Sequence, residues 1–239
     1  MSDHLHPAGF CAIMLILLAY PARADISMQD VRIYTANDPP YVVVDKQGQL
    51  IGGTTVDKML QVLEELQLSP DIIQSVPWSR ALKEARNNPG VMIFPMAKTV
   101  ERLKYFDFTF KIIDSYVYFY KLKHREDIQL NQLEDARKYS ICVVSNDYRQ
   151  EYLEAEGFTR LDFATDSTLN VKKFIHGRCD LIISTEIGLA SKLKSLDQDG
   201  TIVKRLLLLD KLDSALYAAF NKTTPPEIIE LFRRAAREK

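Results

Sequence analysis

Apolar residues along the chain follow two patterns that predict different elements. Short, mostly apolar runs at residues 91–94 and 140–144, and alternation at residues 31–34, predict strands. Apolar residues three and four positions apart over residues 55–66 predict an amphipathic helix. Strands and helices of these two kinds alternate through the chain, which is typical of parallel sheets with helices on their faces. The pattern therefore predicts an α/β fold.

Two units of this kind follow one another, and each is predicted to form one lobe. Further strands are expected at residues 41–44, 50–51, 71–74, 161–163, 181–184, 202–209 and 215–220. Further helices are expected at residues 79–87, 147–156, 167–176 and 186–194, and from residue 225 onward. Pro95 follows the apolar run that begins at Val91, and it is expected to end that strand.

The first 24 residues differ from the rest of the chain. The apolar run at residues 10–19 is too short to cross a bilayer. Ala22 and Ala24 follow it with the small-x-small pattern of a signal-peptidase site. The stretch before the run contains no Lys or Arg, which is a poor fit to a signal peptide. We predict that residues 1–24 are a cleaved signal peptide and that the mature chain is periplasmic.

The composition is that of an ordinary globular protein. Of 239 residues, 46% are hydrophobic and 26% are charged, which is enough for two lobes with buried cores. The formal net charge of −1 argues against a nucleic-acid partner. After the leader, no apolar run reaches the roughly 20 residues of a membrane helix, so we expect no membrane insertion of the mature chain.

Cysteine and histidine are scarce after the leader. Cys142 and Cys179 can pair in an oxidising compartment, or pack as small apolar residues. Their positions beside predicted buried strands favour the second interpretation. His124 and His176 are too few and too far apart in sequence to suggest a metal site. We therefore predict no metal and no cofactor.

The loop after residue 94 carries the first candidate for ligand chemistry. Thr99 and Arg102 form a T-x-x-R pattern just past a core strand, where α/β folds keep their ligand crevices. The planar guanidinium of arginine can hold a carboxylate with two parallel hydrogen bonds. The alternative is that Arg102 caps a turn or pairs with Glu101 at the surface.

Three segments carry a resemblance to a known family. They are PWSRAL at residues 77–82, FPMAKTVER at residues 94–102 and FDF at residues 106–108. They resemble the extracellular solute-binding proteins of family 3, the periplasmic receptors of polar amino-acid ABC importers. The resemblance implies a two-lobe periplasmic-binding fold of type II, in which Arg102 grips the carboxylate of an amino acid.

The resemblance also implies how the lobes are connected. In the family the second lobe is inserted into the first, so the chain crosses twice and forms a two-strand hinge. Crossings are expected near residues 117–121 and 214–218. We assign residues 25–120 and 214–239 to the first lobe and 121–213 to the second. Compared with the family, further helical sequence is expected after Lys239.

Three residues of the first lobe are candidates to contact the ligand. Tyr41 follows the Pro39-Pro40 turn and matches an aromatic residue that lines the cleft in the family, although a half-buried strand tyrosine is the alternative. Trp78 stands at a helix start and either stacks on the ligand or packs structurally. Arg80 faces either the cleft or the solvent.

The second lobe supplies four more candidates. Asn146 and Asp147 lie where a strand meets a helix, and the N–H groups of a helix start bind carboxylates. Asp147 can instead cap the helix and partly fill that anion site. Thr185 falls where the family has an aspartate for the ligand ammonium, and Glu186 either substitutes for it or caps its helix.

These residues predict a monomeric, non-enzymatic binding protein. It would close around a small carboxylate or amino acid and deliver it to an ABC permease. One alternative is a cyclohexadienyl-dehydratase-like enzyme, with Glu186 or Asp38 as the general acid. Another is a ligand sensor that is not coupled to transport.

Overall fold

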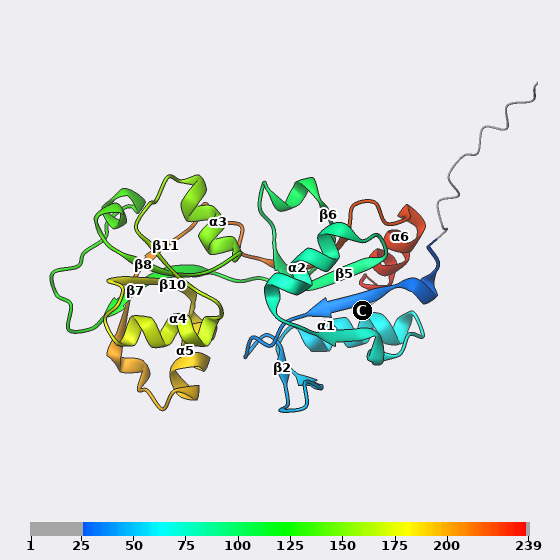
Figure 1. Ribbon diagram of the computed structural model, residues 1–239, viewed down its shortest axis with the longest axis horizontal. Coiled ribbons are helices and arrows are strands. Elements are labelled where there is room, and N and C mark those ends of the chain that lie inside the picture. Colours follow the sequence, from blue (N-terminus) through cyan, green and yellow to red (C-terminus); the bar gives the residue numbers. More distant parts are fainter. Residues whose placement is uncertain (1–25, 238–239) are drawn as a thin grey trace, which may run out of the picture.

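The computed structural model describes residues 26–237, so the predicted signal peptide lies outside the described residues. Two α/β lobes lie side by side (Figure 1). The strands are β1 (Arg32–Thr35), β2 (Val43–Val44), β3 (Leu50–Gly52), β4 (Ile73–Ser75), β5 (Val91–Ala97), β6 (Phe106–Ile113), β7 (Val117–Leu122), β8 (Ile141–Val144), β9 (Leu161–Ala164), β10 (Leu181–Thr185), β11 (Val203–Leu208) and β12 (Leu216–Asn221).

Helices cover both faces of each sheet. The α-helices are α1 (Val56–Glu65), α2 (Trp78–Asn87), α3 (Tyr148–Ala155), α4 (Ser167–Ile175), α5 (Glu186–Ser195) and α6 (Pro226–Ala235). The short 3-10 helices are η1 (Met28–Asp30), η2 (Pro70–Ile72), η3 (Arg102–Lys104), η4 (Leu133–Lys138) and η5 (Gly200–Ile202). Within residues 26–237, no helix combines the length and apolar character needed to cross a membrane.

The first lobe is built on a sheet with the strand order β4-β1-β5-β12-β6. β1 runs parallel to β4 and β5, whereas β12 runs antiparallel to β5 and β6. Side chains alternate along β5: Met92 and Phe94 pack in the core that includes α1 and α6, and Val91 and Ile93 pack in the core that includes α2. This alternation is the period-two pattern of a strand that is buried on both faces.

Pro95 does not end β5, contrary to the sequence prediction. The strand continues to Ala97, and its pairing with β12 shifts register between Tyr217 and Ala219. A bulge of this kind leaves one residue out of the hydrogen-bond ladder. Proline lacks the N–H that the ladder requires, so it is tolerated at such a position.

The second lobe is built on a sheet with the strand order β11-β7-β10-β8-β9. β7 runs antiparallel to β10 and β11, whereas β8 runs parallel to β10 and β9. One core contains residues of α3, and the core on the other side contains residues of α4 and α5. The fold class predicted from the sequence is therefore confirmed in both lobes.

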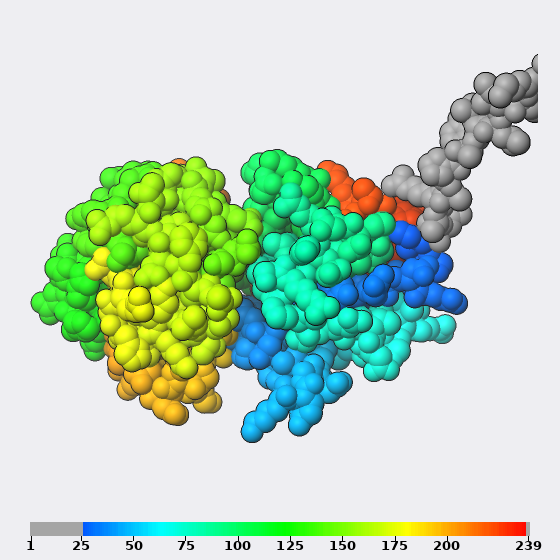
Figure 2. Space-filling view, viewed as in Figure 1, coloured from blue at the N-terminus to red at the C-terminus, as the bar shows by residue number. Residues whose placement is uncertain are grey.

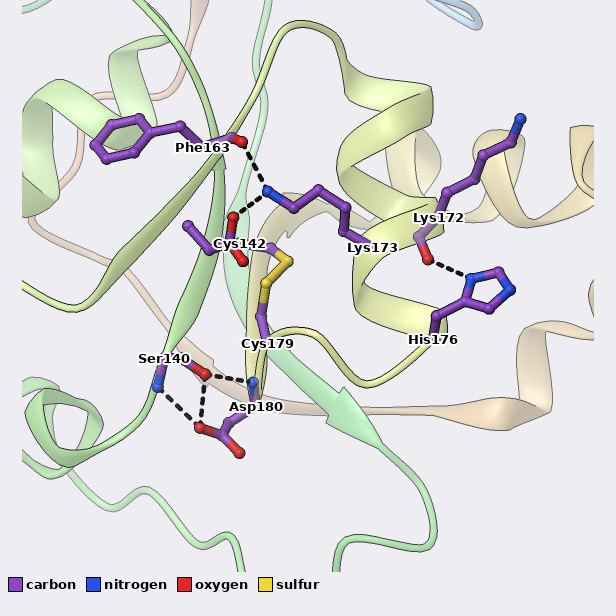
Figure 3. The surroundings of a disulfide bond; sticks show 9 residues. Ser140, Cys142, Phe163, Lys172, Lys173, His176, Cys179 and Asp180 are labelled. Atoms are coloured by element: carbon purple, nitrogen blue, oxygen red, sulfur yellow. Dashed lines mark hydrogen bonds and ion pairs between the residues drawn. A yellow bond between two sulfur atoms is a disulfide. The ribbon is translucent and has the colours of Figure 1, made fainter.

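A disulfide joins Cys142 and Cys179, where the sequence favoured unpaired packing (Figure 3). Cys142 lies in β8 opposite Ile182 of β10, and Cys179 precedes β10 by two residues. This adjacency brings the two Cα atoms to 5.6 Å, within the range of a disulfide. Next to it, the Asp180 carboxylate accepts hydrogen bonds from the backbone and hydroxyl of Ser140.

The chain crosses between the lobes at residues 114–116 and 209–215. The first crossing was predicted at residues 117–121, but those residues form β7 of the second sheet. Residues 106–120 read as one aromatic-rich run, so their sequence does not reveal the break. The Ser214 hydroxyl donates a hydrogen bond to the Ser115 carbonyl at 2.5 Å and links the two crossings.

Candidate ligand-binding cleft

A cavity of about 690 Å³ lies between the lobes, which meet along the seam visible in Figure 2. Its walls come from the carboxyl ends of β1, β4 and β5 in the first lobe and of β8, β9 and β10 in the second, where α/β sheets bind ligands. The polar and aromatic lining consists of Asn37, Asp38, Tyr41, Ser75, Trp78, Ser79, Arg102, Ser145, Asn146, Asp147, Tyr148, Arg149, Thr165, Asp166, Ser167 and Thr185.

Arg102 lines the cavity, but its guanidinium is already bound by protein groups. Its Nε and Nη2 donate to Oε1 of Glu151 at 3.1 and 2.9 Å. Nη2 also donates to the Asn146 carbonyl at 3.1 Å, and Nη1 donates to the Ala97 carbonyl at 3.2 Å. Four of its five N–H groups are therefore engaged by the described residues. In this conformation a solute cannot take the two-pronged grip that the sequence predicted.

Thr99 completes the binding of the Glu151 carboxylate. Its hydroxyl donates to Oε2 of Glu151 at 2.8 Å and accepts a hydrogen bond from the Arg102 backbone at 3.1 Å. Thr99 and Arg102 belong to the first lobe, whereas Glu151 belongs to α3 of the second. Glu101, the surface partner considered for Arg102, pairs with Lys104 instead.

Glu151 is not among the site residues predicted from the sequence. It lies four residues after Asp147, so both are on the same face of the helix start. This four-residue spacing from Asp147 could have identified Glu151 as a candidate. Its pairing with Arg102 depends on how the lobes meet, which local sequence does not encode.

Trp78 and Asn146, both predicted to contact the ligand, line the cavity from opposite lobes. The indole Nε1 of Trp78 donates to the Asn146 carbonyl at 2.8 Å. Asn146 has a φ of 60°, a left-handed conformation that asparagine tolerates better than most residues other than glycine. Its carbonyl thus accepts hydrogen bonds from both Trp78 and Arg102 of the first lobe.

Asp147 lines the cavity and fills the anion site at the start of α3. As the helix N-cap it accepts a hydrogen bond from the Arg149 backbone at 2.9 Å. The Arg149 side chain also donates to both of its carboxylate oxygens, at 2.6 and 2.8 Å. Burial alone raises the pKa of the Asp147 carboxyl, but the charge and hydrogen bonds of Arg149 outweigh it, so that the net pKa is lowered.

Two further contacts join the lobes beside the cavity. The hydroxyl groups of Tyr41 and Thr185 share a hydrogen bond of 2.5 Å, and burial of Tyr41 raises the pKa of its phenol. Lys192 of α5 donates to the Asp38 carboxylate at 2.7 Å and to the Pro39 carbonyl. Tyr41 and Thr185, both candidates for ligand contact, line the cavity and contact each other.

Arg80 and Glu186 lie outside the cavity, and this corrects their predicted position. Arg80 is exposed on α2, because two residues along a helix rotate a side chain about 200° away from Trp78. The Glu186 side chain is 69% exposed and pairs with Arg205 on β11 at 3.1 Å. The strand-to-helix boundary turns Thr185 toward the cleft and Glu186 away from it.

Residues 165–167, the segment after β9, also line the cavity and were not predicted as site residues. Asp166 caps α4 by accepting a hydrogen bond from the Leu169 backbone at 2.8 Å, and it lines the cavity. The sequence could have identified Asp166 as a candidate, because it follows a strand predicted to be parallel, as Asn146 does. Arg149 was missed as well, since nothing in its local sequence indicates burial.

Two α/β lobes, two crossings and a cleft lined from both sides define a two-lobed ligand-binding protein of the periplasmic-binding type. The chain belongs to the bacterial extracellular solute-binding proteins, family 3, whose family model matches residues 31–225. The family named from the sequence is therefore confirmed, and with it a solute-binding role. A search of curated protein sequences finds no match.

Solved structures with the same fold share little sequence with this chain. A histidine kinase sensor domain with similarity to periplasmic binding proteins is 15% identical, with a TM-score of 0.72 over 87% of this chain and 89% of that one. An ancestral arginine-binding protein bound to arginine is 16% identical, with a TM-score of 0.70 over 87% and 91%. The ancestral amino acid-binding protein AncCDT-1, a precursor of cyclohexadienyl dehydratase, is 17% identical, with a TM-score of 0.69 over 87% and 88%. At these identities, the similarity establishes the fold alone.

Proposed function

We propose that this protein is a periplasmic solute-binding protein that closes its lobes around a small, carboxylate-bearing, amino-acid-like solute and delivers it to an ABC importer. Family membership supports the binding role. Among proteins of the same fold are the substrate-binding protein of an amino acid ABC transporter and an ancestral arginine-binding protein. Closure around a ligand that contacts both lobes requires no catalysis.

The observation that carries the proposal is the way Thr99 and Arg102 hold a carboxylate between the lobes. Three hydrogen bonds from these two side chains converge on the carboxylate of Glu151. Charge-assisted bonds of this kind contribute about 1.5–3 kcal/mol each. In the proposed complex the carboxylate of the solute takes the place of the Glu151 carboxylate.

The remaining walls suit the rest of an amino-acid-like molecule. A volume of about 690 Å³ lies within the usual range of small-molecule pockets, roughly 300–1,000 Å³. Tyr41, Trp78 and Tyr148 supply aromatic surface. Asp166 supplies a carboxylate that can receive an ammonium group.

Titration calorimetry of the mature protein with the proteinogenic L-amino acids and small organic acids tests this proposal. We expect at least one of these carboxylates to bind, and Arg102→Met to abolish its binding. Arg80→Met, which removes an exposed arginine of the same lobe, should bind as the wild type does. Undiminished affinity in Arg102→Met, or a solute without a carboxylate as the ligand, would refute the assignment.

Two other functions are less well supported by the cleft. A dehydratase requires a general acid in the cavity, but Glu186 lies at the surface and Asp38 is bound by Lys192. Incubation with prephenate, with aromatic product as the readout, tests that activity. The similarity to a kinase sensor domain is compatible with sensing without transport. A permease and an ATPase encoded beside the gene would favour transport instead.

A further inference from the structure

Two carboxylates of the second lobe occupy positions where the carboxylate of a solute is expected. Glu151 lies on the donor face of Arg102, and Asp147 lies at the start of α3. These are the two contacts that a bound amino acid would make with its carboxylate. The protein therefore supplies both acidic groups from its own chain.

Only one of these two carboxylates can exchange easily with a solute. Asp147 is held by the side chain of Arg149 on the same helix, so lobe movement leaves that pair intact. Glu151 is held by Thr99 and Arg102 of the opposite lobe, so lobe opening breaks its contacts. Its side chain is 22% exposed and can turn into water, whereas the Arg102 side chain is 4% exposed.

A solute carboxylate and Glu151 cannot share Arg102 in the closed form. Four of the five guanidinium N–H groups already have partners among the described residues, and Nε and Nη2 both point at Glu151. Two carboxylates at one guanidinium would also repel each other. One of them has to leave before the other binds.

We propose that Glu151 is an internal carboxylate that holds the solute-free protein closed and competes with the solute for Arg102. Glu151 thereby sets the affinity for carboxylate ligands and selects for those that can displace it. The competition rests on the proposed function, whereas the closure does not. Each part is therefore tested by its own measurement.

Small-angle X-ray scattering of the solute-free protein tests the closure. The variant is Glu151→Gln, and the matched control is Glu154→Gln, which alters an exposed glutamate on the same helix. We expect the wild type and the control to have the same radius of gyration, and Glu151→Gln to have a larger one. An unchanged radius in Glu151→Gln, with the native circular dichroism spectrum, overturns the closure.

Titration calorimetry with the L-amino acids tests the competition. We expect Glu151→Gln to bind carboxylate ligands at least about tenfold more tightly than the wild type and Glu154→Gln, because no charged group then has to be displaced. Equal or weaker binding overturns the competition. If no carboxylate binds any of the three proteins, the proposed ligand class fails together with the competition, and the scattering alone decides the closure.

Discussion

The cleft contains two kinds of polar contact, which differ in whether they cross between the lobes. Arg102, Trp78 and Tyr41 of the first lobe find their partners across the cleft, in the second lobe. Asp147 and Arg149, by contrast, satisfy each other at the start of one helix of the second lobe, and a disulfide fixes the neighbouring sheet. This part of the second lobe is therefore preformed, whereas the contacts across the cleft are completed by closure.

This difference decides what lobe opening costs. A hydrogen bond across the cleft can be replaced by water when the lobes part, because both groups then become accessible. The pair within one lobe, Asp147 with Arg149, stays together when the lobes part, and because the two side chains are only 17% and 15% exposed, losing one partner leaves the other charge poorly compensated. Substitutions in the second lobe should therefore cost more stability than matched substitutions in the first.

The largest effect is expected from the disulfide. Replacing Cys142 and Cys179 with serine should lower the free energy of unfolding by about 4 kcal/mol, because the bond closes a loop with a sequence separation of 37. Urea denaturation followed by circular dichroism measures this loss. Wild type treated with a reducing agent is the control and should lose a similar amount. A loss below about 1 kcal/mol would show that the constraint on the unfolded chain is small.

The next effect concerns the half-buried pair of Asp147 and Arg149 in the second lobe. Asp147→Asn should cost about 2.5 kcal/mol at neutral pH, because Arg149 is left without its carboxylate. Because the pKa of Asp147 is lowered in the folded protein, its carboxylate stabilises the wild type fully above the unfolded pKa of about 3.9. This stabilisation is lost as the pH falls through the folded pKa.

Urea titrations between neutral and acidic pH measure this effect. As the pH falls, the free energy of unfolding should decrease less steeply in Asp147→Asn than in the wild type. Asp57→Asn, which alters an exposed aspartate of α1, is the matched control and should keep the wild-type slope. If the free energy of unfolding decreased with pH identically in all three proteins, the stabilising role of the Asp147 carboxylate would be contradicted.

The sequence predicted most elements of the fold because the signals are local. The helix expected at residues 55–66 is α1 (Val56–Glu65), and the strand expected at 140–144 is β8 (Ile141–Val144). The failures depend on tertiary contacts. Pro95 continues a strand only because β12 accommodates a bulge, and Cys142 reaches Cys179 only because β8 and β10 are neighbours.

The pair across the cleft should show a smaller effect than Asp147. Arg102→Met should lower the free energy of unfolding by about 2 kcal/mol, since Glu151 can turn toward water once its partner is gone. Arg80→Met should change it by less than about 0.5 kcal/mol. A greater loss in Arg102→Met than in Asp147→Asn would reverse the comparison between the lobes.

The smallest effect is expected at Tyr41. Tyr41→Phe removes one hydrogen bond to Thr185 and should cost about 1 kcal/mol. Tyr116, which is 65% exposed, provides the matched control, and Tyr116→Phe should be neutral. Thermal unfolding of the two variants side by side measures the difference. Equal melting temperatures would mean that this contact does not stabilise the closed form.

The site was predicted less completely than the fold. Asn146 was proposed because it lies where a strand meets a helix, and Trp78 and Thr185 were proposed from their match to family positions; all three line the cavity. Whether a residue beside a strand end points into the cleft depends on how the following helix is rotated. The sequence does not show this rotation, and Glu186 was therefore wrongly included among the cleft residues. The occupation of Arg102 by Glu151 depends on the fit of two lobes, and no local pattern contains it.

The hydrogen bond between Ser214 and Ser115 has a consequence for the movement of the whole molecule. It joins the two crossings to each other between the lobes. We expect lobe opening to be a rotation about this pair of crossings and not a translation of one lobe along the other. Residues far from residues 114–116 would then move furthest.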